Sequence, residues 1–325
     1  MTETAKERVI EGRSRYELQR EFSIDRLYTF HYYELSKSFY STGEKHDFWE
    51  MLYVDKGALE LFLDGCRIEL TQGDLIFYEP NAFHSGGAKT ATNVMIVTFD
   101  ASAPCMSQLG NRLFRLEKDE LYILTELLKE GFEAFDPPID TLFYPQLGTN
   151  KQAPFGCEHM IIAYLELFLI KLLRRVNAVA PAGALKALMA AGENQKGKLI
   201  EDIVGYMKRN VAANLTLDEI SEQFFISKTQ LKVLFKQAMG IGIMHYFSLL
   251  KIDEAKEAIR EESYNYTEIA QKLGYSSVHY FSKCFKRATG MTPTEYAKTV
   301  QSNIRRKQPS GSRQLSDFSE RGEHM

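Results

Sequence analysis

The feature of this sequence that most restricts its fold is an internal repeat in the last third of the chain. Glu219 of the first copy aligns with Glu268 of the second at an offset of 49 residues. Further along, Tyr246 aligns with Tyr296 at an offset of 50, so the second copy contains one extra residue near Gly274. A repeat of this length indicates a supersecondary unit that occurs twice. The last third is therefore built from two equivalent units.

Each copy has the pattern of a short helix, a tight turn and a longer helix. Thr216 and Glu219 are spaced as a capping box, in which each side chain bonds a free backbone amide at the start of a helix. Asn265 and Glu268 are spaced in the same way in the second copy. Apolar residues at helical spacing follow in both copies, and residues 247–262 predict a helix that connects them. This is the pattern of two helix-turn-helix units.

In a helix-turn-helix unit, the N-terminal part of the second helix reads base edges in the major groove. Once the apolar face is assigned to the core, the opposite face is fixed by helical geometry. In the first copy that face carries Lys228, Thr229, Lys232 and Val233. In the second copy it carries Val278, His279, Ser282 and Lys283. Further along the two helices, the residues predicted to meet phosphates are Lys236, Lys286 and Arg287.

The charge distribution agrees with a nucleic-acid partner for this part of the chain. Residues 198–308 carry 17 Lys and Arg against 12 Asp and Glu, although the whole chain has a net charge of −3. A basic module attached to an acidic one suits a polyanion. The alternatives are a helical bundle with solvated lysines and a repeat that binds protein. Two aligned copies within a basic module favour DNA.

The segment from Leu215 to Lys298 resembles the DNA-binding region of the AraC/XylS-type transcription regulators over its full length. It departs from that family at Lys251, where Arg is commoner, at Ser221, where Ala is usual, and at Phe225, where the residue is often smaller. The resemblance implies two recognition helices that read successive major grooves on one face of the DNA. It also implies a homodimer, with double-stranded DNA and RNA polymerase as partners, and more often an activator than a repressor.

The N-terminal part has a different pattern, with short segments rich in β-branched and aromatic residues between residues 22 and 99. Turn residues separate these segments, which predicts a sandwich or small barrel. From residue 117 onward the pattern becomes helical. We therefore expect an α+β multidomain protein. Its predicted parts are a cupin-like β-barrel sensor (1–110), a helical dimerisation region (111–176), a linker (177–197), an all-α tandem helix-turn-helix domain (198–300) and a disordered tail (301–325).

Residues 43–84 resemble the cupin-type sensor half of the same family. His46 and Glu50 lie four apart, so on a strand they point to the same side, and with His84 they occupy places where enzymatic cupins hold metal ligands. Phe48, however, stands where metal-binding cupins usually have a second His. A polar pocket for a small effector is the favoured interpretation, and no metal or other cofactor is expected. The alternatives are a divalent cation site and a purely structural hydrogen bond between His46 and Glu50.

Four aromatic residues near these positions are candidates to line the effector pocket, although ordinary core packing is the alternative for each of them singly. They are His31, Tyr33, Trp49 and Tyr53. Aromatic rings suit the faces of a carbohydrate, but nothing in the pattern selects sugars over other metabolites. The wide apolar arc of the helix at residues 154–175 covers the barrel on one side and offers the other to a partner chain.

The chain is expected to be a cytoplasmic regulator and not an enzyme. Its N-terminus lacks the apolar core of a signal peptide. The longest apolar run, residues 161–173, is interrupted by Glu166 and Lys171 and is too short to span a membrane. The four cysteines are far apart and are expected to be reduced. The rival is a cupin metalloenzyme with an accessory helical domain. The missing second His argues against it, and so does the repeat, which such an enzyme would not need.

Overall fold

The computed structural model describes residues 17–63, 66–141, 146–178 and 194–305. Within these residues the N-terminal strands form two sheets, which confirms the predicted cupin-like β domain. The five-stranded sheet has the order β1-β8-β3-β6-β9, and the four-stranded sheet has the order β2-β7-β4-β5. All strand pairs within these sheets are antiparallel. The strands are β1 (Leu27–Leu35), β2 (Tyr40–Glu44), β3 (Trp49–Lys56), β4 (Ala58–Leu63), β5 (Cys66–Thr71), β6 (Asp74–Tyr78), β7 (His84–Ala88), β8 (Thr92–Phe99) and β9 (Leu113–Arg115).

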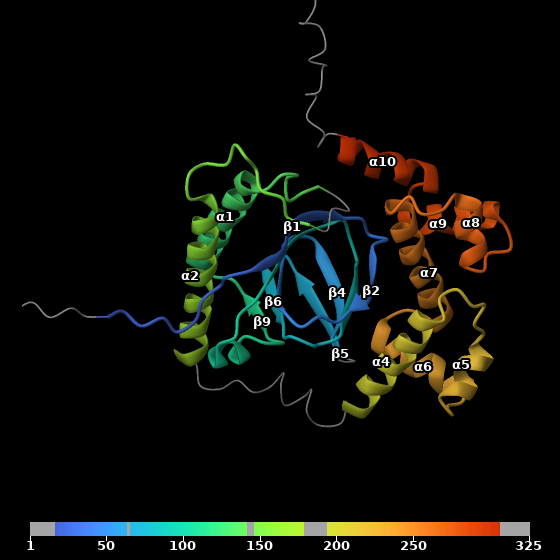
Figure 1. Ribbon diagram of the computed structural model, residues 1–325. Helices are drawn as coiled ribbons and strands as arrows, with labels where there is room; N and C mark the ends of the chain where they lie inside the picture. Colours follow the sequence, from blue (N-terminus) through green and yellow to red (C-terminus); the bar gives the residue numbers. More distant parts are fainter. Residues whose placement is uncertain (1–16, 64–65, 142–145, 179–193, 306–325) are drawn as a thin grey trace, which may run out of the picture.

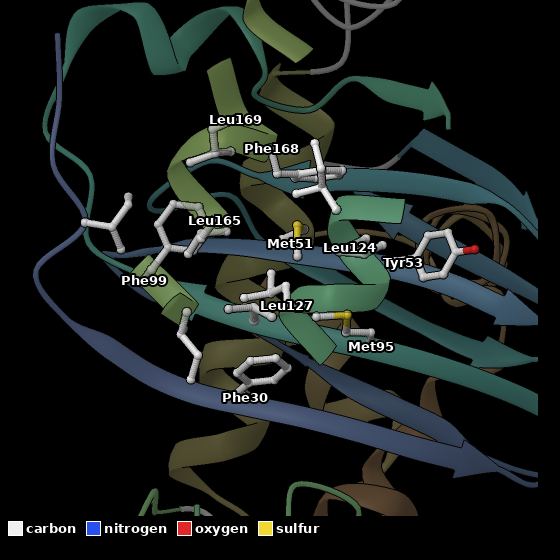
Figure 2. Close-up of a cluster of buried hydrophobic side chains, with 14 of the residues drawn as sticks. Phe30, Met51, Tyr53, Met95, Phe99, Leu124, Leu127, Leu165, Phe168 and Leu169 are labelled. Atoms are coloured by element: carbon white, nitrogen blue, oxygen red, sulfur yellow. The ribbon is translucent and has the colours of Figure 1, made fainter. Parts of the chain in front are cut away.

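Two long helices cover the outer face of the five-stranded sheet, as Figure 1 shows. They are α1 (Lys118–Ala134) and α2 (Cys157–Ala178), and the short 3-10 helix η1 (Pro104–Gln108) precedes them. Phe30 and Met51 from the strands pack there against Leu127 and Phe168 from the helices, all of them fully buried (Figure 2). This core lies outside the barrel. A second core, containing Val54, fills the space between the two sheets.

The C-terminal part is all-helical, as the repeat predicts. Both predicted capping boxes form, with Thr216 before α5 and Asn265 before α8. In each unit a short helix is followed by a longer one, and α7 connects the two units. The helices are α4 (Asn194–Arg209), α5 (Leu217–Gln223), α6 (Lys228–Met239), α7 (Ile243–Arg260), α8 (Tyr266–Lys272), α9 (Val278–Thr289) and α10 (Pro293–Arg305).

Helices extend into the two segments that the sequence predicts to be a linker with some helix and a disordered tail. Helix α2 continues to Ala178 and α4 begins at Asn194, so both ends of the expected linker (177–197) are helical. Helix α10 continues to Arg305, although a disordered tail was expected from residue 301. Residues 301–305 extend a helix that has already formed from Pro293 onward, and extending a helix is easier than starting one. The rest of the expected linker and tail lies outside the described residues.

The two turns between the helices of each unit use the left-handed backbone region. In the second turn this position is Gly274, with φ +70°, and in the first it is Phe225, with φ +52°. A side chain in this region costs about 1–2 kcal/mol, which glycine avoids. The ring of Phe225 is 98% exposed and recovers little of this cost by packing. The departure at Phe225 noted in the sequence therefore corresponds to backbone strain.

We expect Phe225→Gly to raise the free energy of unfolding by about 1 kcal/mol, because it relieves a left-handed conformation without removing a buried contact. Chemical denaturation of the full chain measures this difference. Phe225→Ala is the control, since it removes the ring but keeps a Cβ in the strained backbone. If alanine and glycine stabilise the protein equally, backbone strain at Phe225 is not the reason.

Candidate functional site

The predicted recognition helices are α6 and α9, and each buries one face in the core of its own unit. In α6, Leu231 and Phe235 are fully buried, and in α9 Phe281 and Phe285 are fully buried. Ser227 and Ser277 each accept a hydrogen bond from a backbone amide at the start of the helix that follows. The serine caps set where each helix begins, and the burial of the apolar face sets which side chains remain outside.

The exposed face of α6 is the one expected from the sequence. Its five predicted DNA-contacting residues are all exposed in the folded chain, and they are Lys228, Thr229, Lys232, Val233 and Lys236. Lys228 forms an ion pair with Asp218 of α5, with 2.7 Å between Nζ and the carboxylate oxygen. Thr229 and Val233 also line a shallow groove of about 610 Å³ against Leu199 of α4.

The face of α9 agrees with the expectation less completely. Four of its predicted residues are exposed: His279, Lys283, Lys286 and Arg287. Val278 and Ser282 are only half-exposed, and Val278 packs against the core of the second unit. Two further exposed side chains on these helices are not among the predicted residues: Tyr280, which is 53% exposed, and Gln237 on α6. Helical spacing could have found both, because Tyr280 lies three residues before Lys283 and Gln237 four residues after Val233.

In α9, loss of a base contact and loss of a phosphate contact should have different effects on DNA binding. His279→Ala or Lys283→Ala should lower affinity by about 1–3 kcal/mol at particular base pairs and relax preference there. Lys286→Ala should weaken binding to all duplexes and reduce its dependence on salt, because a phosphate contact is lost. Titrations of selected and random duplexes at several salt concentrations measure both effects. Equal losses on selected and random DNA for all three variants would refute this assignment of the recognition face.

The second candidate site lies in the β domain and joins His46, Glu50 and His84. His46 Nε2 lies 3.1 Å from Glu50 Oε2, and His84 Nε2 lies 3.7 Å from the same oxygen. Glu50 and His84 are both buried. Glu50 comes from β3 and His84 from β7, but His46 lies in the loop before β3 and not on the strand. The expected proximity to Glu50 is therefore correct, but the loop and not strand alternation produces it.

The outer nitrogen of each histidine ring is held by a backbone carbonyl. His46 Nδ1 lies 2.9 Å from the oxygen of Phe48, and His84 Nδ1 lies 3.1 Å from the oxygen of Ala82. A carbonyl only accepts, so each Nδ1 carries a hydrogen and each Nε2 faces the carboxylate. Burial alone lowers the pKa of His84, but the carboxylates of Glu44 and Glu50, which lie 3.8 Å and 3.7 Å from its Nε2, raise it to about 10. The pKa of Glu50 is held below its usual range in spite of burial, first by its hydrogen bond with His46 and then by the nearby ring of His84.

This cluster could act as an ion-paired network or as a ligand set. The three ligand atoms all lie within 4.8 Å of one another, which suits a divalent cation. Carbonyl-held Nδ1 atoms also orient ligating histidines in metal sites. Phe48 supplies no ligand, because a phenyl ring has no donor atom, and it stacks instead on the ring of His46, with 4.0 Å between centroids, and on that of Tyr28, with 4.1 Å. The residue in place of the usual second His thus forms part of an aromatic wall.

The four aromatic candidates do not share one cavity. Trp49 and Tyr53 are buried in the core between the five-stranded sheet and the helices, where Figure 2 labels Tyr53. Neighbouring residues of a strand point to opposite faces, so Trp49 cannot lie in the barrel when Glu50 does. This corrects their assignment to an effector pocket. His31 and Tyr33 lie on the inward face of β1, with ring centroids 4.6 Å apart.

The titration of His84 predicts a pH dependence of stability. Its pKa is about 10 in the folded chain and its ordinary value is 6.5. Because the folded value is the higher one, the contribution of the ion-paired cluster is complete below pH 6.5 and is lost as pH rises toward 10. The free energies of unfolding of the wild type and of His84→Gln, measured by denaturation between pH 6 and pH 10, should converge at high pH. A difference that stays constant across this range would contradict an ionised His84.

Strand β2 joins the β domain to the first helix-turn-helix unit. The hydroxyl of Tyr40 donates to the carbonyl of Met239, at the end of α6. The hydroxyl of Tyr246, in α7, donates to the carbonyl of Thr42. The Thr42 hydroxyl donates to Asp253 across 2.9 Å. These bonds connect an edge strand to the two helices that support the first recognition face.

Charged and apolar contacts extend this junction. Lys45 forms an ion pair with Glu201 of α4 at 2.9 Å, and Lys208 Nζ donates to the carbonyl of Gly43 across 3.1 Å. The ring of Phe83 is buried in the core of the first helix-turn-helix unit. The junction lies away from the predicted recognition residues of α6, which remain exposed beside the β domain.

Comparison with known protein families assigns both parts of the chain. Residues 220–299 match a helix-turn-helix domain model, and residues 32–100 match a cupin domain model. A curated relative, "Probable transcriptional regulator LumQ" of Photobacterium leiognathi, is 26% identical over 257 residues, which cover 78% of this chain and 91% of the relative. The "HTH-type transcriptional activator RhaR" of Yersinia pseudotuberculosis is 28% identical over 100 residues, which cover 31% of this chain and 34% of the relative.

Solved structures with likeness to this chain include the C-terminal domain of AraT, a response regulator from Geobacillus stearothermophilus. That domain is 26% identical, with 39% of this chain and 94% of the domain covered and a TM-score of 0.30. ToxT from Vibrio cholerae O395 is 16% identical, with 87% of this chain and 99% of that chain covered and a TM-score of 0.36. Among the described residues, no single helix is long and apolar enough to cross a membrane. Helices α6 and α7 reach the required length and composition only when they are taken together, as a pair bent by 57°.

Proposed function

Since this chain is a DNA-binding transcription regulator of the AraC type with a cupin-like effector domain, we propose that α6 and α9 are its recognition helices and that the His46, Glu50 and His84 cluster senses the effector. The observation that carries the proposal is the junction at β2. It connects the strands around the buried cluster to the first recognition unit while the recognition face stays exposed. A regulator needs both a free reading surface and a connection to its sensor.

Strand alternation supplies the route from the cluster to the DNA-binding module. His84 faces the cluster, whereas its neighbours Phe83 and Ser85 face the first helix-turn-helix unit. Glu44 of β2 pairs with His84 across the ladder. An effector that displaces Glu50 from His84 would shift β7 and β2 together, because the two strands share backbone hydrogen bonds. That shift reaches α6 and α7 through the junction.

The chemistry of the cluster selects the kind of effector. Two histidines around one carboxylate present a charged, hydrogen-bonding site within an apolar barrel, which suits a small polar metabolite. His31 and Tyr33 supply adjacent aromatic faces. The relatives of this chain are named regulators, and Glu50 is already paired with His46 at 3.1 Å, so we propose no catalytic role for the cluster. Metal analysis of purified protein tests this, since stoichiometric Fe, Mn or Zn with turnover of a substrate would favour the enzyme instead.

The exposed sides of α1 and α2 support the proposed homodimer. Large apolar side chains remain outside the β-domain core on both helices, and they are Leu121, Tyr122, Met160 and Leu167. A pair of helices with this outer surface suits a second copy of the chain. Regulation of promoters by such a dimer would bring it into contact with RNA polymerase in the cytoplasm.

The proposed reading of DNA is tested by sequencing the fragments that the full-length protein retains from genomic DNA, at low and high salt. Enriched fragments should share a motif with two adjacent half-sites, and retention should fall steeply with salt. Recovery of the input distribution at every salt concentration would refute sequence-specific binding.

The junction predicts the effect of uncoupling the sensor. Tyr40→Phe combined with Thr42→Val removes two side-chain hydrogen bonds, one to α6 and one to α7. We expect transcription from the target promoter without added effector to move toward the induced level, with the added response reduced severalfold. A reporter assay with and without a metabolite extract measures both values. Tyr28→Phe is the matched control, because it removes a hydroxyl that bonds Asp100 elsewhere on the β domain. An unchanged dose response in the double variant would refute the coupling.

A further inference from the structure

Helix α7 belongs to both helix-turn-helix units. Leu250 and Phe247 are buried in the core of the first unit, whereas Ile252 and Ala255 are buried in the core of the second. Lys251 lies between these two sets and is only 7% exposed. A lysine at the boundary of two cores is unusual, because its charge must leave water. Its partners therefore indicate why it is there.

The amine of Lys251 bonds one partner in each unit. Its Nζ donates to the carbonyl of Leu273, across 2.7 Å, at the end of α8 in the second unit. It also donates to Oδ1 of Asn214, across 3.4 Å, in the segment before α5 of the first unit. Both acceptors are neutral oxygens, so the amine links the units without forming a carboxylate ion pair in either bond.

Aromatic rings and close packing complete the same junction. Lys251 Nζ lies 5.1 Å from the ring centroid of Phe247 and 5.7 Å from that of Tyr275, one ring from each unit. Gly274 follows Leu273 and lies so close to Asn214 that a Cβ there would come within 2.7 Å of the amide oxygen. Gly274 is the counterpart of Phe225, so the turn of the second unit, in which the extra residue follows Gly274, lies where the two units touch.

We propose that Lys251 fixes the angle between the two recognition helices and so determines which spacing of the two DNA half-sites the protein accepts. This inference rests on the proposed reading of DNA by α6 and α9. Successive major grooves recur every 10–10.5 base pairs or so, so one inserted base pair rotates a half-site by about 34°. A pair of units held rigidly tolerates such a change poorly. A pair that can pivot about α7 tolerates it better.

The test uses the full-length protein and a duplex that the wild type selects from a random library. Affinity is measured for this duplex and for versions with one base pair inserted or deleted between the half-sites. We expect the wild type to lose on the order of tenfold upon insertion, and Lys251→Met to lose less than about threefold. Lys251→Arg keeps a donor and should retain most of the discrimination. Lys272→Met is the matched control for loss of a charge, since this exposed lysine lies on α8.

The ratio of the affinities for the original and the altered spacing distinguishes a role of Lys251 in positioning the two units from a role in folding. A variant that is merely destabilised loses affinity for all duplexes in proportion, whereas a pivoting variant loses discrimination. Asn214→Ala is a milder second variant, because Asn214 is exposed and its loss leaves the bond to Leu273 intact. Asn214→Ala should lower this affinity ratio to a value between those of the wild type and Lys251→Met. Undiminished spacing discrimination in both Lys251→Met and Asn214→Ala would overturn the proposal. A wild type that selects no duplex would instead overturn the proposed reading of DNA.

Discussion

Helix α7 is the element on which the arrangement of the C-terminal domain depends, because it contributes to two hydrophobic cores at once. Its first turns pack with α4 and α6, and its last turns pack with α8 and α9. Two units that share one helix cannot be placed independently. The same helix also bonds the β domain through Tyr246 and Asp253. Helix α7 thereby restricts the placement of α6 and α9 relative to each other and to the β domain.

The β domain meets this element through a strand whose two faces have different tasks. The side of β7 that carries His84 closes a buried ion-paired cluster, and the opposite side, with Ser85 and the preceding Phe83, faces the first DNA-binding unit. Buried ion pairs are sensitive to any group that competes for one partner, because an unpaired buried charge is costly. In the proposed mechanism, an effector that competes for Glu50 would therefore displace the residues next to His84 on β7.

Much of the C-terminal domain could be predicted because its signals are local. Capping boxes, turn residues and an apolar stripe all act within a few residues along the chain, and the repeat doubles each signal. The exposed faces of α6 and α9 followed from that stripe, apart from the half-burial of Val278 and Ser282. In the β domain the proximity of Glu50 and His84 was expected, but the assignment of Trp49 and Tyr53 was wrong. The helices on the outer face of the sheet bury these rings, and strand alternation could have excluded them from the barrel.

By itself, the sequence determined the two-part organisation, the helix-turn-helix repeat and the residues available to contact DNA, because periodicity and capping are properties of short segments. Only the tertiary structure decided which face of the sheet the helices cover, that β2 bonds α6 and α7, and that Lys251 joins two units through Leu273 and Asn214. These contacts join residues far apart in the chain. Nothing in the local pattern of either partner specifies the other, so the packing of whole elements has to bring them together.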